Sequence, residues 1–135
     1  MLKKLIPNLM VEDVRHTLTF YQDILNFRVV MTLPESAPFD FAIVQRDGVE
    51  LMFQSRQSLS ENVPTLAGSA VGASQTFYIE VDGINELYQQ LRDKVEIVVD
   101  LHTTFYGTQE LYFRDINGYI LSFSEAIQPS GPASD

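Results

Sequence analysis

The chain has 135 residues, a net charge of −9, a hydrophobic content of 45% and no cysteine. This length suits one globular domain, and the missing cysteines exclude a disulfide framework, a thiol nucleophile and a cysteine-ligated zinc site. The acidic balance argues against binding to nucleic acid, which draws its affinity from neutralised phosphates. No apolar run is long enough to span a membrane. The basic start of the chain has neither an apolar core nor a cleavage site of a signal peptide, so we expect a cytoplasmic protein.

The first half of the chain predicts four strands and one helix. The strand-like segments are residues 5–11, 27–32, 39–45 and 49–54. After the first of them, Asp13 can cap a helix whose apolar face recurs at helical spacing. That face consists of Val14, Leu18, Tyr21 and Leu25. Between the last two strands, Asp47-Gly48 is the signal of a type I′ hairpin.

The second half predicts the same order of elements after a segment rich in Ser, Gly and Ala at residues 55–74. The strand-like segments are residues 76–81, 95–101, 110–114 and 119–125. Asp82 can cap the second helix, whose apolar face consists of Ile84, Leu87, Tyr88 and Leu91. Asn117-Gly118 lies in the last hairpin, and residues 128–135 read as a flexible tail.

The two halves match each other at a constant offset of 70 residues. Asp47-Gly48 falls on Asn117-Gly118, and Leu51 falls on Leu121. A repeat of one supersecondary unit indicates two similar modules packed in one domain. We therefore predict a single domain over residues 1–127, with module one at about 4–54, a linker at 55–74 and module two at about 75–126.

Several motifs of the chain resemble those of one protein superfamily. They are Val11-Glu12-Asp13, Phe20-Tyr21, Leu25-Asn26-Phe27, Tyr106-Gly107 and the segment from Phe113 to Tyr119. Together they resemble the vicinal oxygen chelate superfamily, also called the glyoxalase/bleomycin-resistance/dioxygenase family. Asn26 stands where the family usually has Gly, and Ile116 stands where it usually has Pro. The resemblance covers residues 4–126.

The resemblance implies an α+β fold of two tandem β-α-β-β-β modules that form a cupped, half-open mixed β-barrel. It also implies a homodimer and a ligand site inside the cup. Members of the family act as isomerases, dioxygenases, thiol transferases or antibiotic-binding proteins, so the fold alone does not assign an activity.

The metalloenzymes of this family place one metal ligand on the first strand and one on the last strand of each module. The matching positions here are Ile6, Met52 or Glu50, Thr76 and Ser122. Ile6 has no donor atom, hydroxyl groups are weak ligands, and a single carboxylate does not hold a catalytic ion. We therefore expect no metal site and no cofactor. His16 and His102 are expected to lie outside the cup.

Strand parity gives most of the cup-facing candidates for ligand binding. Phe105 and Tyr106 are added because the resemblance implies that the loop containing Tyr106-Gly107 borders the pocket. The full set is Asn8, Met10, Glu50, Met52, Gln54, Thr76, Tyr78, Phe105, Tyr106 and Ser122. Phe105 and Tyr106 form an aromatic wall or simply pack the loop. Glu50 serves as a general base or ionic anchor, or as an ion-paired strand residue, for instance with Arg56 or Arg114.

Three functions remain open at this point. The first is a metal-independent binding protein resembling bleomycin-resistance proteins, which sequesters a small organic ligand; the charge of −9 makes a cation one candidate, although acidity also serves solubility alone. The second is a lyase, isomerase or dioxygenase that acts on a small oxygenated metabolite, with Glu50 as its catalytic residue. The third is a regulatory module without a small ligand.

Overall fold

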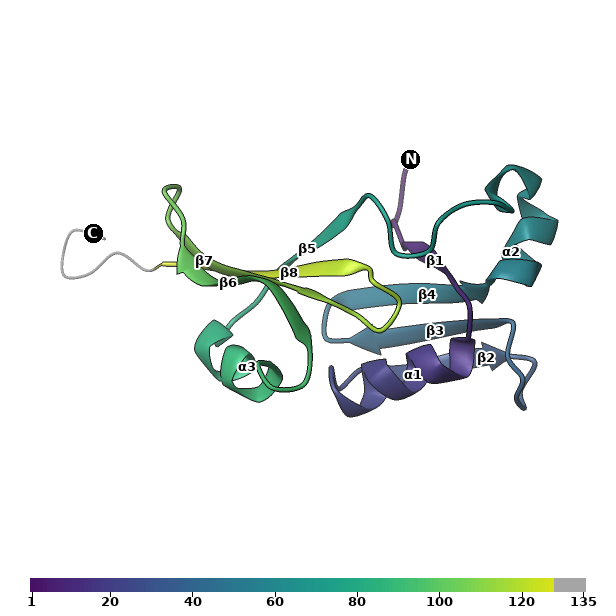
Figure 1. Ribbon diagram of the computed structural model, residues 1–135, viewed down its shortest axis with the longest axis horizontal. Coiled ribbons are helices and arrows are strands. Elements are labelled where there is room, and N and C mark those ends of the chain that lie inside the picture. Colours follow the sequence, from purple (N-terminus) through teal and green to yellow (C-terminus); the bar gives the residue numbers. More distant parts are fainter. Residues whose placement is uncertain (128–135) are drawn as a thin grey trace. The chain divides into compact units, whose positions relative to one another are not determined.

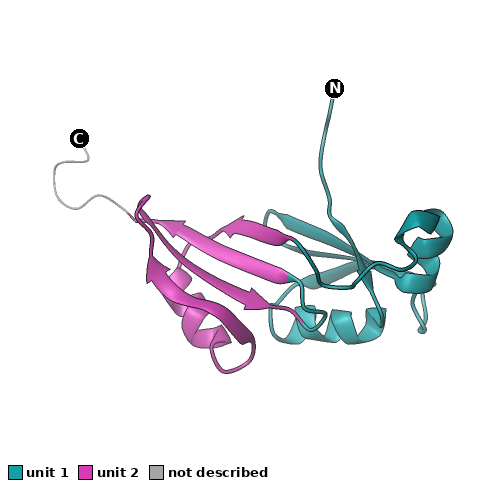
Figure 2. Ribbon diagram, turned by 45° about the horizontal axis from the view of Figure 1, so that its top comes forward, with its two compact units in different colours: residues 1–74, 116–119 teal, residues 75–115, 120–135 magenta. Residues whose placement is uncertain are grey.

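The computed structural model describes residues 1–127, so the tail predicted at 128–135 lies outside the described residues. The chain divides into two compact units, residues 1–74 with 116–119 and residues 75–115 with 120–135 (Figure 2). Each unit carries one four-stranded mixed sheet with helices, which confirms the predicted α+β class with two β-α-β-β-β modules (Figure 1). None of the helices in the described part of the chain is long and apolar enough to cross a membrane.

Unit 1 has the strand order β1-β4-β3-β2, with β1 parallel to β4 and the other neighbours antiparallel. Its elements are β1 (Asn8–Val11), α1 (Val14–Asp23), β2 (Arg28–Leu33), β3 (Phe41–Arg46), β4 (Val49–Ser55), α2 (Arg56–Asn62) and the 3-10 helix η1 (Pro64–Leu66). Asp13 caps α1 as predicted, because its carboxylate accepts from the backbone N–H of His16 at 3.0 Å. The buried ring of Tyr21 packs on Phe27 and Phe53 in the hydrophobic core of this unit.

Unit 2 has the strand order β5-β8-β7-β6. Its elements are β5 (Thr76–Glu80), α3 (Ile84–Leu91), β6 (Glu96–Thr103), β7 (Thr108–Arg114) and β8 (Ile120–Ala126). Helix α3 contacts β7 and β8, where Leu111, Phe113 and Leu121 are completely buried. These apolar residues form the helix-covered face of the sheet, as their parity predicts.

Three local predictions were wrong. The turn at Asp47-Gly48 joins β3 and β4 as a hairpin, but only Asp47 has a positive φ, so it is not the type I′ turn. Helix α3 begins at Gly83 rather than at a capping Asp82, and the carboxylate of Glu125 accepts from the first backbone N–H groups instead. The segment expected only as a link contains α2, which Ser55 caps and Leu59 anchors in the core.

The connection between β7 and β8 belongs to unit 1 rather than to unit 2. The side chain of Asn117 donates to Thr17 Oγ1 at 3.0 Å, and the hydroxyl of Tyr119 donates to the backbone oxygen of Met10 at 2.6 Å. Both partners belong to the module that contains β1 and α1. These two bonds therefore fix residues 116–119 against a buried part of unit 1.

Candidate functional site

The face of the unit 2 sheet opposite α3 carries a cluster of polar and aromatic side chains. Cross-strand partners in a sheet point to the same face. Ser122 of β8 is the register partner of Tyr78 in β5 and of Tyr112 in β7. Two residues further along β8, Ser124 is the register partner of Glu110 in β7. We call these side chains, together with Tyr106 and Thr108, the open face of unit 2.

Glu110 is the centre of the open face. Its side chain is completely buried, and both carboxylate oxygens accept hydrogen bonds from hydroxyl groups. Oε1 accepts from Tyr106 at 2.8 Å. The donors to Oε2 are Tyr78 at 2.9 Å, Thr108 at 3.0 Å and Ser124 at 2.9 Å. Four hydroxyl groups therefore surround this carboxylate, three of them at Oε2 and one at Oε1.

The hydroxyl groups also determine the charge state of Glu110. Burial alone raises the pKa of this carboxyl, but the four hydroxyl donors outweigh burial and hold its pKa below the ordinary value. All four donors are neutral, and no Lys, Arg or His in residues 1–127 lies within ion-pair distance of Glu110. The open face therefore holds a buried negative charge that no cation of the described chain neutralises.

Two tyrosines form the rim above this carboxylate. The side chains of Tyr78 and Tyr106 remain 54% and 55% exposed although their hydroxyl groups reach Glu110. The hydrogen bond to Glu110 raises the pKa of Tyr106, which keeps this phenol protonated as a donor. Phe105 is fully exposed and packs edge-on against Tyr106, with 5.1 Å between ring centroids. Exposed aromatic rings beside an anion are chemically suited to a cationic organic group.

Ser122, which occupies one metal-ligand position of the family, is completely buried between Tyr78 and Tyr112 in the register. Its hydroxyl oxygen has no hydrogen-bond partner within the described residues. An unpaired buried hydroxyl costs free energy, so Ser122 is an unsatisfied polar group beneath the open face.

The predicted residues of module one lie together on the sheet of unit 1. Asn8 pairs with Met52 and Met10 pairs with Gln54 in the register of β1 and β4. The amide of Asn8 donates to Gln54 at 2.9 Å, and Gln54 donates onward to Ser58 at 2.8 Å. Thr76 of unit 2 is exposed at the start of β5.

Glu50 forms an ion pair with Lys4. Neither of the partners suggested by the sequence contacts it, because Arg56 binds Glu12 at 2.8 Å and Arg114 binds Glu96 at 3.0 Å. Glu50 is therefore an ion-paired strand residue, one of the two roles that the sequence left open, with Lys4 as its partner.

The donor set does not fit the metal that the superfamily implies. Ile6 offers no donor atom, and Thr76 and Ser122 offer only hydroxyl groups. The remaining position offers the thioether of Met52 or the carboxylate of Glu50, which is paired with Lys4. A hard or borderline divalent ion is held by several carboxylate or imidazole ligands, and a single carboxylate does not replace them. Within residues 1–127, no group of three or more His, Cys, Asp or Glu side chains is arranged to hold a metal ion.

The prediction that His102 lies in a loop away from the ligand face was wrong. His102 belongs to β6 and is the register partner of Glu110, so it lies on the open face. Two register shifts, after Ile97 and after Val99, displace it from the parity that a regular strand would give. Its Nδ1 atom lies 2.8 Å from the backbone oxygen of Asp100.

Sequence reasoning missed Glu110 itself. Ser122 was assigned to the ligand face from strand parity, Ser124 two residues later shares that face, and the last hairpin pairs Ser124 with Glu110. Extending the register across the hairpin would have assigned Glu110 to the same face. The signal was therefore present, but Glu110 is the first residue of the predicted strand at 110–114, and a carboxylate at such a position is ordinarily exposed to solvent.

The chain belongs to the Glyoxalase/Bleomycin resistance protein/Dioxygenase superfamily, whose family model matches residues 6–123. A protein of unknown function from Agrobacterium tumefaciens str. C58 has a similar structure, with a TM-score of 0.77 and 19% identity over 94% of this chain and 96% of its own. TioX from Micromonospora sp. ML1 has a TM-score of 0.73 and 15% identity over 93% of this chain and 99% of its own.

Lactoylglutathione lyase from Agrobacterium tumefaciens has a TM-score of 0.70 and 16% identity over 93% of this chain and 95% of its own. At such identities the similarity establishes the fold, while function depends on the particular residues of each site. No curated protein matches the chain.

Proposed function

We propose that the chain is a metal-independent binding protein for a small organic cation, which it sequesters as bleomycin-resistance proteins sequester their ligand. The observation that supports this most strongly is the buried carboxylate of Glu110 beneath two half-exposed tyrosines, with no cation of the described chain to neutralise it. The charge of an ionised carboxylate costs free energy when buried, and a cationic ligand would compensate part of this cost.

The aromatic rim supports the same ligand class. The rings of Tyr78 and Tyr106 offer exposed faces, and a cation over a tyrosine ring gains roughly 0.5–2 kcal/mol. Exposed Glu80 pairs with Ser124 in the register and adds a second negative charge on this side of the sheet. The net charge of −9 favours the approach of a cation over long distances.

For the alternative, a lyase, isomerase or dioxygenase, the open face offers two candidate proton acceptors, Glu110 and its register partner His102. A general base works best when its pKa lies near the operating pH, whereas the pKa of Glu110 is lowered by the hydroxyl groups that donate to it. Glu110 is therefore better suited to anchor a positive charge than to remove a proton. The predicted homodimer and the cytoplasmic location remain part of this proposal.

Calorimetric titration with benzyltrimethylammonium, choline and a panel of cationic antibiotics tests the proposal, with 3,3-dimethylbutan-1-ol as a neutral isostere of choline. We expect the cations to bind and the neutral isostere not to bind. Glu110→Gln should weaken binding at least tenfold by removing the buried charge, and Tyr106→Leu should weaken it severalfold. Tyr88→Leu on α3 is the matched control and should leave binding unchanged.

Equal binding of choline and its neutral isostere would contradict a cation site. Metal analysis of the purified protein after equilibration with nickel, manganese, iron and zinc tests whether the function is metal-independent. Tight stoichiometric binding of any of these ions would contradict a metal-independent function and favour the enzyme.

A further inference from the structure

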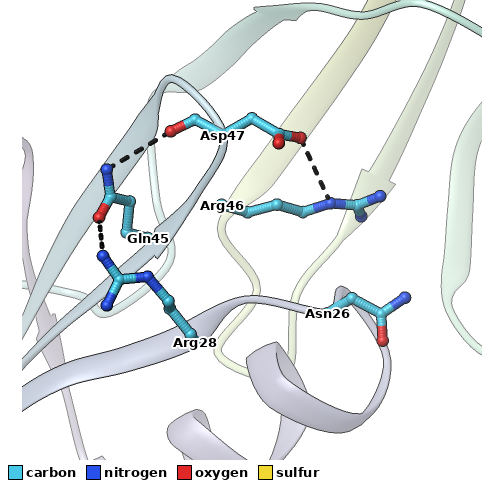
Figure 3. A pocket seen from close by; sticks show the side chains of 5 residues that line it. All are labelled: Asn26, Arg28, Gln45, Arg46 and Asp47. Atoms are coloured by element: carbon cyan, nitrogen blue, oxygen red, sulfur yellow. Dashed lines mark hydrogen bonds and ion pairs between the residues drawn. The ribbon is translucent and has the colours of Figure 1, made fainter.

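Unit 1 contains a second potential binding site, an open pocket of about 330 Å³ at the end of its sheet. The pocket lies where the chain leaves α1, enters β2 and turns from β3 to β4. Its lining residues are Asn26, Arg28, Gln45, Arg46 and Asp47 (Figure 3). The chain has only 9 basic residues against 18 acidic ones, yet two arginines line this one pocket.

Both guanidinium groups are held by neutral partners. Arg28 donates from Nη2 to the side-chain oxygen of Gln45 at 2.6 Å, and Arg46 donates from Nη1 to the backbone oxygen of Leu25 at 2.8 Å. Such hydrogen bonds fix the orientation of a guanidinium without neutralising its charge. Since arginine carries five N–H donors, each side chain retains several donors for a ligand.

Carboxylates compensate these charges only weakly. Within residues 1–127, no carboxylate lies within ion-pair distance of Arg28. The Nε atom of Arg46 lies 3.9 Å from Asp47, whose side chain is 92% exposed, and water screens such a pair effectively. The pocket is therefore locally positive in a chain that is strongly acidic.

Asn26 adds a polar group at the position where the family usually has glycine. Its φ of 57° lies in the left-handed region, which asparagine tolerates better than most residues. Figure 3 shows Asn26 and the guanidinium of Arg46 on one side of the pocket, with Arg28 and Gln45 on the other. A glycine would satisfy the backbone here, whereas asparagine also adds an amide group to the residues that line the pocket.

We infer that this pocket binds the oxyanion group of a small molecule, a phosphate or a carboxylate. Planar guanidinium groups match the geometry of both anions, and Asn26 offers a further N–H donor. This site is separate from the open face of unit 2 and has the opposite charge preference, so it does not depend on the proposed function.

The test is a titration of the 15N-labelled protein with inorganic phosphate at constant ionic strength, followed by backbone amide chemical shifts. Phenyl phosphate and benzoate serve as parallel titrants and identify which oxyanion is preferred. We expect saturable shifts at residues 26–28 and 45–47. Arg28→Gln should weaken binding about tenfold, since it removes a charge-assisted hydrogen bond. Asp47→Asn should tighten binding severalfold, because it removes a repelling carboxylate and asparagine accepts the φ of 50° at this turn.

Arg15→Gln is the matched control, because Arg15 is an exposed arginine of α1 outside the pocket and should leave the affinity unchanged. The proposal is overturned if the amides of the pocket do not shift. It is also overturned if Arg28→Gln and Arg15→Gln weaken binding equally, which would indicate a general effect of charge.

Discussion

The hydroxyl of Tyr106 donates a 2.8 Å hydrogen bond to Oε1 of Glu110, and this bond links a half-exposed ring to a completely buried carboxylate. The two residues lie four positions apart, on the turn before β7 and within β7 itself. Glu110 is the only charged side chain that is fully buried in residues 1–127. Through this hydrogen bond, Tyr106 of the surface turn stabilises this buried carboxylate.

Tyr106→Phe should destabilise the fold by about 1–2 kcal/mol. A hydrogen bond to a charged group contributes more than one between neutral groups, and its loss leaves Oε1 of Glu110 without this donor. The half-exposed ring lets water replace part of the bond, which limits the loss. Urea denaturation at neutral pH measures the change, with Phe105→Leu as the control because its exposed side chain should cost less than about 0.5 kcal/mol. Equal losses for the two variants would exclude a specific role of the hydroxyl group.

The stability contributed by Glu110 should depend on pH with a definite sign. Its pKa is lower in the folded chain than in the unfolded chain, so the folded state favours the ionised form. The stabilisation is therefore fully present above the unfolded pKa of about 4.3 and is lost as the pH falls through the lower folded value.

Comparison of the wild type with Glu110→Gln isolates this effect. The difference between their free energies of unfolding should be constant from neutral pH to about pH 5 and should shrink below it. Glu80→Gln, at an exposed position of the same sheet face, serves as the control. A difference that stays constant down to pH 3 would show that ionisation of Glu110 does not contribute to stability.

The sequence predicted the modules well because their signals are local. Leu51 and Phe53 occupy alternate positions of one predicted strand, and Leu121 and Phe123 do the same 70 positions later; all four are buried in the structure. Alternation decides which face of a strand enters the core, whatever the rest of the chain does. The helical spacing of apolar residues likewise located α1 and α3, whereas α2, in the segment expected as a link, was missed.

The candidate site was harder to predict because it depends on irregular backbone. Tyr106 reaches Glu110 from a turn in which Gly107 has a φ of 89°, and parity says nothing about side chains in such turns. His102 reaches the open face through two register shifts in β6. Lys4, the partner of Glu50, lies before the first strand. Each of these contacts lies beyond the reach of a pattern based on regular strands.

Glu125→Ala should destabilise the chain through the start of α3, by more than Glu125→Gln does. The carboxylate of Glu125 accepts from the backbone N–H groups of Gly83 and Ile84 at 3.1 and 2.9 Å, and α3 has no capping side chain at Gly83. These bonds satisfy two otherwise free donors and place a negative charge at the positive end of the helix. Thermal denaturation measures the loss, and Glu125→Gln should lose less because its amide oxygen still accepts. An Ala variant as stable as the wild type would contradict the capping role.

Gly72→Ala should be among the most damaging small substitutions, with a loss of about 2–4 kcal/mol. Gly72 has a φ of 84°, and a Cβ atom there would lie 2.3 Å from the backbone oxygen of Asn117. The backbone at Asn117 cannot easily move away from this Cβ atom, because two hydrogen bonds hold the segment in place. The side chain of Asn117 donates to Thr17, and the hydroxyl of Tyr119 donates to the backbone oxygen of Met10. Gly68→Ala is the matched control, since a Cβ at Gly68 meets no atom within 4 Å. Urea denaturation of both variants checks the prediction, and similar stabilities would show that the segment at residues 116–119 moves aside at little cost.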